Sequence, residues 1–125
     1  MDLYSEIILD HYHHPRNFGS LENPDYYAEE YNSLCGDRIE IFLNIKNHLV
    51  QDVKFQGEGC AISQASASLL TDHVKKLKNM GKIKQLSEAD ALRLLGIDLT
   101  PARRKCALIA YLALRKAVNH STPNP

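Results

Sequence analysis

Residues 37–59 read DRIEIFLNIKNHLVQDVKFQGEG, and the alternation of apolar and polar residues in this stretch is the clearest indication of the fold. Its first half alternates between two sets of positions, which is the period of a half-buried strand. The apolar set is Ile39, Ile41, Leu43 and Ile45, and the opposite set is Glu40, Phe42, Asn44 and Lys46. After a turn at 47–48, the second half places Leu49, Val53 and Phe55 on one face. The stretch therefore predicts an antiparallel hairpin with one apolar face.

The residues before this hairpin predict a helix, a loop and a weaker strand. The helix spans 2–14 and ends before Pro15, because proline disfavours the helical conformation in the residue that precedes it. Its apolar positions are Leu3, Ile7, Ile8 and Tyr12. The run RNFGSLENPD at 16–25 has the composition of turns, and YYAEEYN at 26–32 is a candidate edge strand.

Helices follow the hairpin. The segment 61–79 carries an apolar face made of Ala61, Ile62, Ala65, Leu69, Val74 and Leu77. A shorter helix opens with the capping pair Ser87 and Asp90 and ends at Gly96. Thr100 and Pro101 start the last helix, whose inward residues are Leu108, Tyr111, Leu112 and Val118. This order predicts the α+β class, with a small antiparallel sheet packed on one side by helices.

Composition narrows the classes of function. The 125 residues are 44% hydrophobic and 24% charged, as expected for a single domain over 1–125 with a core of its own. Fifteen basic and fifteen acidic side chains cancel, so we expect neither nucleic acid nor a membrane as a partner. The acidic start MDLYSEIILD is unlike a signal peptide, and no apolar run could span a bilayer, which predicts a cytoplasmic location.

Three cysteines, Cys35, Cys60 and Cys106, stand at the junctions of the predicted elements. Their odd number and wide spacing argue against a disulfide framework. Together with Asp37, they could form a tetrahedral metal site with distances of about 2.3 Å to sulfur and about 2.1 Å to oxygen. The alternative stays open at this point, because cysteine is often a buried core residue and no CxxC or HxxxH spacing marks a metal site.

Four segments carry a family resemblance: LDHYHHPRN at 9–17, CGDRI at 35–39, GEGCAISQASASLL at 57–70 and PARRKCALIAYLALRKAV at 101–118. Together they resemble the iron–sulfur cluster assembly scaffold family, the IscU/SufU type related to the N-terminal domain of NifU. The resemblance implies the α+β fold of that family and a metal or cluster site formed by Cys35, Asp37, Cys60 and Cys106. It also implies a cysteine desulfurase as the sulfur-donating partner, together with other iron–sulfur assembly proteins.

The residues around the third cysteine separate two branches of this family. In the IscU branch a histidine precedes that cysteine and an LPPVK stretch recruits a chaperone, whereas this chain reads LTPARRKC, with Lys105 in place of the histidine. The PARRKCAL segment resembles the SufU branch, whose members bind zinc and pass on sulfur. The interval from Cys60 to Cys106 is nevertheless too short for the insertion typical of SufU.

The resemblance implies a protein of iron–sulfur cluster biogenesis and leaves three functions open. The first is a zinc-binding sulfur acceptor and transfer protein, the second a scaffold that holds a transient [2Fe-2S] cluster, and the third a structural zinc domain. Whether the chain is itself an enzyme, a zinc-dependent sulfurtransferase, also stays open. We predict that Cys35 accepts the sulfur, because a thiolate in a loop can move toward a partner while Cys60 and Cys106 are tied to helices.

Overall fold

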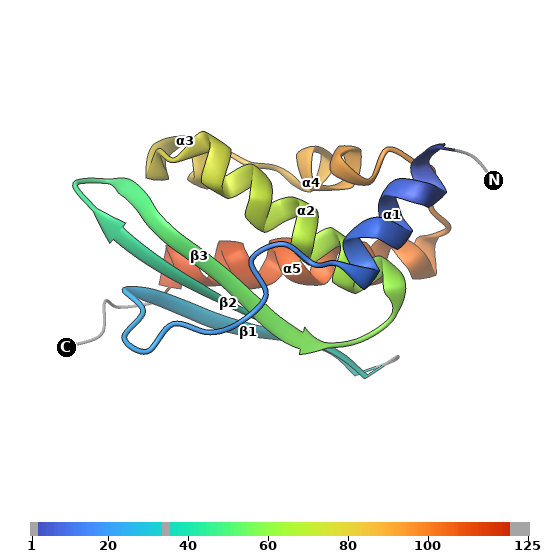
Figure 1. Ribbon diagram of the computed structural model, residues 1–125, viewed down its shortest axis with the longest axis horizontal. Helices are drawn as coiled ribbons and strands as arrows, with labels where there is room; N and C mark the ends of the chain where they lie inside the picture. Colours follow the sequence, from blue (N-terminus) through green and yellow to red (C-terminus); the bar gives the residue numbers. More distant parts are fainter. Residues whose placement is uncertain (1–2, 34–35, 121–125) are drawn as a thin grey trace.

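A computed structural model describes residues 3–33 and 36–120 of the chain (Figure 1). The fold is α+β, as the sequence predicts. One helix precedes three strands, and four helices follow them. The elements are α1 (Leu3–His13), β1 (Tyr26–Asn32), β2 (Asp37–Lys46), β3 (Leu49–Glu58), α2 (Ala61–Leu77), α3 (Met80–Lys84), α4 (Glu88–Leu95) and α5 (Pro101–His120).

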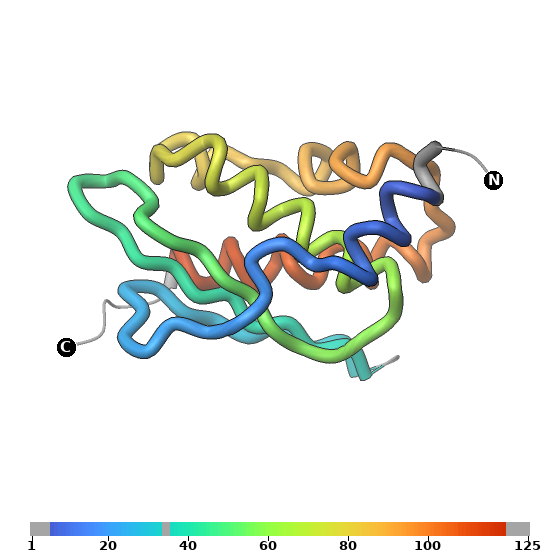
Figure 2. The backbone as a smooth tube through the Cα atoms, viewed as in Figure 1, coloured from blue at the N-terminus to red at the C-terminus, as the bar shows by residue number. Residues whose placement is uncertain are grey.

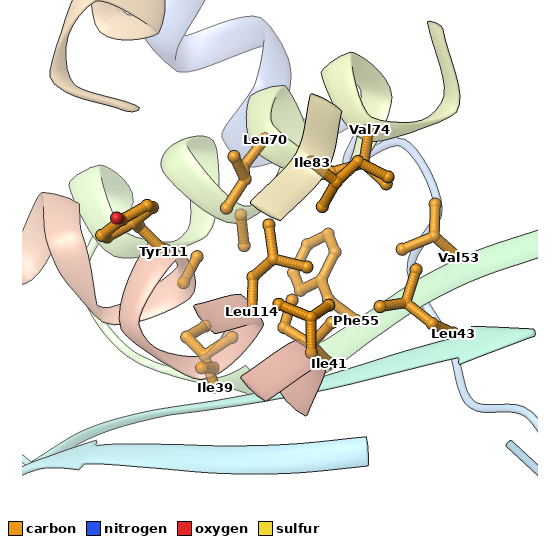
Figure 3. Packing of buried hydrophobic residues seen from close by; sticks show 14 of the residues in the cluster. Ile39, Ile41, Leu43, Val53, Phe55, Leu70, Val74, Ile83, Tyr111 and Leu114 are labelled. Carbon is orange, nitrogen blue, oxygen red and sulfur yellow. The ribbon is translucent and has the colours of Figure 1, made fainter. Parts of the chain in front are cut away.

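The three strands form one antiparallel sheet in the order β1-β2-β3, and α2 and α5 lie across one of its faces (Figure 1). Five of the predicted inward residues of the hairpin, Ile39, Ile41, Leu43, Val53 and Phe55, are at most 1% exposed, whereas Ile45 is half-buried. Figure 3 shows this row facing Leu70 and Val74 of α2 and Leu114 of α5. The period-2 pattern of the hairpin therefore builds the sheet half of the core.

The prediction for Leu49 is wrong. Its side chain is 43% exposed, whereas the neighbouring Val50 is buried. The reason is a shift in the pairing of β2 with β3, because Asn44 pairs with Asp52 while Ile45 pairs with Val50. An extra residue on β3 forms a β-bulge here, and such a bulge moves every side chain on the turn side of it to the opposite face.

Helix α2 is buried around most of its circumference, not along one apolar face. Of the predicted apolar residues, Ile62, Ala65 and Val74 are buried, and Ala61, Leu69 and Leu77 are half-buried. The buried set also includes five polar residues, Ser63, Gln64, Ser66, Ser68 and Thr71. The helix is enclosed because it packs against α1, α4, α5 and β3, and its small residues allow close approach on several sides.

The segment between α1 and β1 covers one edge of the sheet. Phe55 N–H donates to the Asn17 carbonyl at 2.9 Å, and Gly19 N–H donates to the Phe55 carbonyl at 2.8 Å. Figure 2 shows the path of this segment from α1 past β3 to β1. The side chain of Asn17 also donates to Thr71 Oγ1 at 3.1 Å. The predicted turn over 16–25 is thus a structural connection that ties α2 to the sheet.

The last two predicted helices begin and end close to the expected residues. Ser87 and Asp90 form a reciprocal capping box for α4, and Gly96 closes that helix with φ 70°, in the left-handed region. The Thr100 carbonyl accepts from Arg104 N–H at 2.9 Å in the first turn of α5. This start places Cys106 in the second turn of α5, on the side that packs against α1, α2 and α4.

Candidate metal centre

Asp37 is the first residue of β2, and its carboxylate lies inside the protein although it is charged. The side chain is 3% exposed. Gly36 precedes it with φ 75°, a left-handed conformation that glycine adopts without steric cost. The corner between β3 and α2 covers the carboxylate, because a Cβ atom on Gly59 would lie 2.8 Å from Asp37 Cγ.

Cys60 is the N-cap residue of α2 and stands directly over this carboxylate. Its backbone is extended, with φ −74° and ψ 171°, and its side chain makes no capping hydrogen bond. Cys60 N–H donates to Asp37 Oδ1 at 3.3 Å, and its thiol donates to Asp37 Oδ2 at 3.6 Å. The residue as a whole is exposed.

Cys106 approaches the same point from α5. It is half-buried and packs against the small apolar cluster that contains Ile8, Ile62 and Ala107. Lys105, its neighbour in sequence, is exposed. The tight packing on one side fixes the direction in which Cys106 faces the other two residues.

One ligand atom from each of Asp37, Cys60 and Cys106 lies within 4.8 Å of the other two. Around a tetrahedral zinc ion with Zn–S bonds of about 2.3 Å, neighbouring sulfur atoms lie roughly 3.8 Å apart. Small side-chain movements therefore bring these atoms to a common ion. Two thiols and a carboxylate favour zinc or an iron–sulfur centre over magnesium and calcium. Cys35, the fourth predicted ligand, lies outside the described residues.

The surroundings of Asp37 also favour a bound cation. Within residues 3–33 and 36–120, no ion pair involves Asp37. Both hydrogen bonds that its carboxylate accepts there come from Cys60. A buried carboxylate without a compensating charge costs several kcal/mol. A metal ion held by the neighbouring sulfurs would compensate that charge.

Ser63 is a residue of this centre that the sequence analysis missed. It is 0% exposed, and its hydroxyl donates to the Cys60 carbonyl at 3.0 Å and lies 3.9 Å from Cys60 Sγ. The spacing GCxxS indicates this contact, because a serine three residues after an N-cap residue faces back toward that residue.

Ser68 of α2 contacts a histidine of α1, which the sequence alone does not indicate. His11 Nδ1 lies 2.7 Å from Ser68 Oγ. The serine is nevertheless 0% exposed, and its hydroxyl also accepts from Arg16 N–H at 2.9 Å. The pair is therefore a structural contact between α1 and α2.

The sequence matches the family described as NifU-like N terminal domain over residues 3–122. The chain belongs to this family. Among its relatives is the zinc-dependent sulfurtransferase SufU of Bacillus subtilis (strain 168), which is 39% identical in an alignment that covers 93% of this chain and 89% of that protein. The iron–sulfur cluster assembly scaffold protein IscU 1 of Archaeoglobus fulgidus is 34% identical, covering 93% of this chain and 74% of that protein.

A solved structure of the same family type supports the fold. The crystal structure of an iron–sulfur cluster assembly scaffold protein for the SUF system from Fervidobacterium islandicum AW-1 superposes with a TM-score of 0.73. It is 27% identical, and the match covers 93% of this chain and 96% of that one. Within the described part of this family member, no helix is both long and apolar enough to cross a membrane.

Proposed function

We propose that this protein accepts sulfur from a cysteine desulfurase and passes it on in iron–sulfur cluster biogenesis. The observation that carries the proposal is the convergence of Asp37, Cys60 and Cys106 within 4.8 Å, in a family whose members include a zinc-dependent sulfurtransferase. Zinc would be held by these three residues and Cys35. When bound, zinc keeps its cysteine ligands as thiolates.

Cys35 is the proposed sulfur acceptor, because it precedes β2 in the sequence, whereas Cys60 is the N-cap residue of α2 and Cys106 belongs to the packed helix α5. Its thiolate would attack the terminal sulfur of the partner's persulfide. A new S–S bond forms at Cys35, the S–S bond of the donor breaks, and the donor cysteine leaves as a thiolate. The exchange moves one sulfur atom and needs no external oxidant.

Metal analysis after purification without added iron tests the zinc part of the proposal. We expect about one zinc per chain, from the single tetrahedral donor set. Cys106→Ser is the informative variant, because it removes one ligand at a half-buried position and should lower the zinc content strongly. Iron and sulfide with a visible absorption band, and no zinc, would contradict the proposal.

Incubation with a cysteine desulfurase and cysteine, followed by peptide mass spectrometry, tests the acceptor. We expect a mass increase of one sulfur on the peptide that contains Cys35, and none in Cys35→Ser. Persulfide found mainly on Cys60 or Cys106 would assign the acceptor role to another residue.

The second candidate is a scaffold that assembles and releases a [2Fe-2S] cluster, and it is favoured by the similarity to IscU 1 of Archaeoglobus fulgidus. Lys105 separates the two candidates, because a protonated lysine has no lone pair with which to bind a metal. If sulfur transfer is the function, Lys105→His should prolong the lifetime of a reconstituted cluster and lower sulfur acceptance. Equal lifetimes and equal acceptance in both proteins would remove this argument for transfer over scaffolding.

A further inference from the structure

The candidate metal centre also depends on two residues that are not among its predicted ligands, Gly59 and Ser63. Gly59 ends the connection from β3, and Ser63 lies in the first turn of α2. A Cβ atom on Gly59 would lie 2.8 Å from Asp37 Oδ1 and 2.4 Å from Ser63 Oγ. Real Cβ atoms do not approach other atoms this closely, so the position of the carboxylate requires glycine here.

Ser63 fixes the other side of the same corner. Its hydroxyl proton goes to the Cys60 carbonyl at 3.0 Å, which holds the N-cap residue against the first turn of the helix. The same oxygen lies 3.9 Å from Cys60 Sγ, and Ser63 is 0% exposed. Cys60 N–H, held in this way, points at Asp37 Oδ1.

We propose that Gly59 and Ser63 are positioning residues, which set the orientation of Asp37 and Cys60 toward a common ion. Gly59 leaves the space that the Asp37 carboxylate occupies. Ser63 holds the N-cap so that one Asp37 oxygen is bound to Cys60 N–H and the other faces Cys60 Sγ. Groups of this kind, which orient metal ligands without binding the metal, typically change metal affinity by about 10- to 100-fold when they are removed. The inference rests on the proposed zinc function for its effect on affinity.

Helix α2 supplies a matched control for Ser63. Ser66 lies about one turn further along the same helix and is 6% exposed. Its hydroxyl has no hydrogen-bond partner among the described residues. Ser63→Ala and Ser66→Ala therefore remove the same atom from two buried positions of one helix, but only the first removes a contact with Cys60.

The first measurement is zinc affinity by competition with a chromophoric chelator. We expect Ser63→Ala to bind zinc at least tenfold more weakly than the unaltered protein, and Ser66→Ala to remain within twofold of it. The free energy of unfolding of both variants is measured without metal, so that a general loss of stability can be separated from a loss of affinity. Equal affinities for Ser63→Ala and the unaltered protein, or equal losses in the two variants, would overturn the proposal.

The second measurement does not depend on zinc and reads the Cys60 amide directly. In metal-free protein, Gly59→Ala should displace the Asp37 carboxylate, and hydrogen exchange at Cys60 N–H should become about tenfold faster. Ser63→Ala should accelerate the same amide, and Ser66→Ala should not. If the unaltered protein binds no zinc, the proposed function fails while this test still decides the positioning roles. Unchanged exchange at Cys60 in both Gly59→Ala and Ser63→Ala would exclude them.

Discussion

At the scale of single residues, the two charged neighbours Asp37 and Arg38 have opposite environments. Successive side chains of a strand point to opposite faces, so Arg38 lies on the open face of the sheet while Asp37 turns toward the cysteines. Arg38 donates to Glu40 at 2.7 Å and to Glu29 at 3.1 Å. The Arg38 guanidinium is thus paired on the open face of the sheet, and no ion pair with Asp37 occurs among the described residues.

The same network controls the ionisation of Tyr27. Burial and the hydrogen bond to Glu40 at 2.6 Å raise the pKa of Tyr27 to about 12. A raised pKa stabilises the fold below the ordinary value of about 10, and this stabilisation is lost as the pH rises from there through 12. Ultraviolet titration should therefore show one tyrosine that ionises late, and Tyr27→Phe should remove that step. A full set of tyrosines ionising near pH 10 would contradict the prediction.

The sequence predicts Cys35, Asp37, Cys60 and Cys106 as ligands of one site, and it gives no sign of the positioning roles proposed for Gly59 and Ser63. Sulfur and carboxylate groups are recognisable as ligands from their chemistry alone. The roles of Gly59 and Ser63 arise only when the corner between β3 and α2 closes over Asp37, which is a tertiary contact. A glycine next to a candidate ligand indicates that space is needed there. The sequence does not show which side chain occupies that space.

At the scale of elements, α1 is attached to α2 through a histidine in a partly buried position. Burial, and then the nearby Arg16 guanidinium, lower the pKa of His11, while Asp10 and Asp72 act in the opposite direction and Lys76 adds a small further lowering. The folded protein therefore favours the neutral form of the His11 ring. Unprotonated Nδ1 can accept the hydroxyl proton of the serine 2.7 Å away in α2.

Acidification should weaken the contact between these two helices. Because the folded-state pKa of His11 is lowered, its contribution to stability is present above about pH 6.5 and is lost as the pH falls below that value through the lowered pKa. Nuclear magnetic resonance of the His11 ring, together with urea unfolding between pH 7 and pH 5, tests this. A His11 pKa at or above 6.5 in the folded protein would show that the sign is wrong.

The capping box of α4 should make a measurable contribution to global stability. Ser87 Oγ accepts from Asp90 N–H at 3.1 Å, and Asp90 Oδ2 accepts from Ser87 N–H at 2.9 Å. Because Leu95 of this helix is buried between α1, α2 and α5, loss of the cap should reach the whole fold. Ser87→Ala should lower the free energy of unfolding by about 1 kcal/mol in urea denaturation. Ser20→Ala, at an exposed loop position, is the control, and equal losses in both variants would refute the capping role.

The hairpin, the edge strand and the helix caps were all predictable, because each depends on residues close together in sequence. The bulge in β3 was not, since it depends on how β2 and β3 align, and the alternation of LVQDVKF suits either register near the turn. The burial of Ser63, Ser66 and Ser68 was not predictable for a related reason. Helix α2 is enclosed by elements from both ends of the chain. Helical periodicity predicts burial along one apolar face only, and therefore does not predict the burial of polar residues on the other faces.

At the scale of the whole molecule, the candidate metal centre brings together parts of the chain that are far apart in sequence. Asp37 starts a strand, Cys60 caps α2 and Cys106 lies in the second turn of α5. Each of these elements packs against a different part of the core, with α5 lying on β1 and β2 and α2 on β3. An ion bound to all three ligands therefore links the sheet to both of its covering helices, and the unfolded chain cannot reproduce that arrangement.

Zinc should consequently stabilise the folded protein as a ligand that binds only the native state. At a free zinc concentration 100 times the dissociation constant, the expected gain is about 2.7 kcal/mol, with a smaller gain if the unfolded cysteines also bind zinc. Removal of the metal with a chelator should lower the unfolding temperature by an amount that depends on zinc concentration. Cys106→Ser should abolish most of this dependence, whereas Ser66→Ala should retain it. A chelator that leaves the unfolding temperature of the zinc-loaded protein unchanged would mean that zinc does not connect these elements.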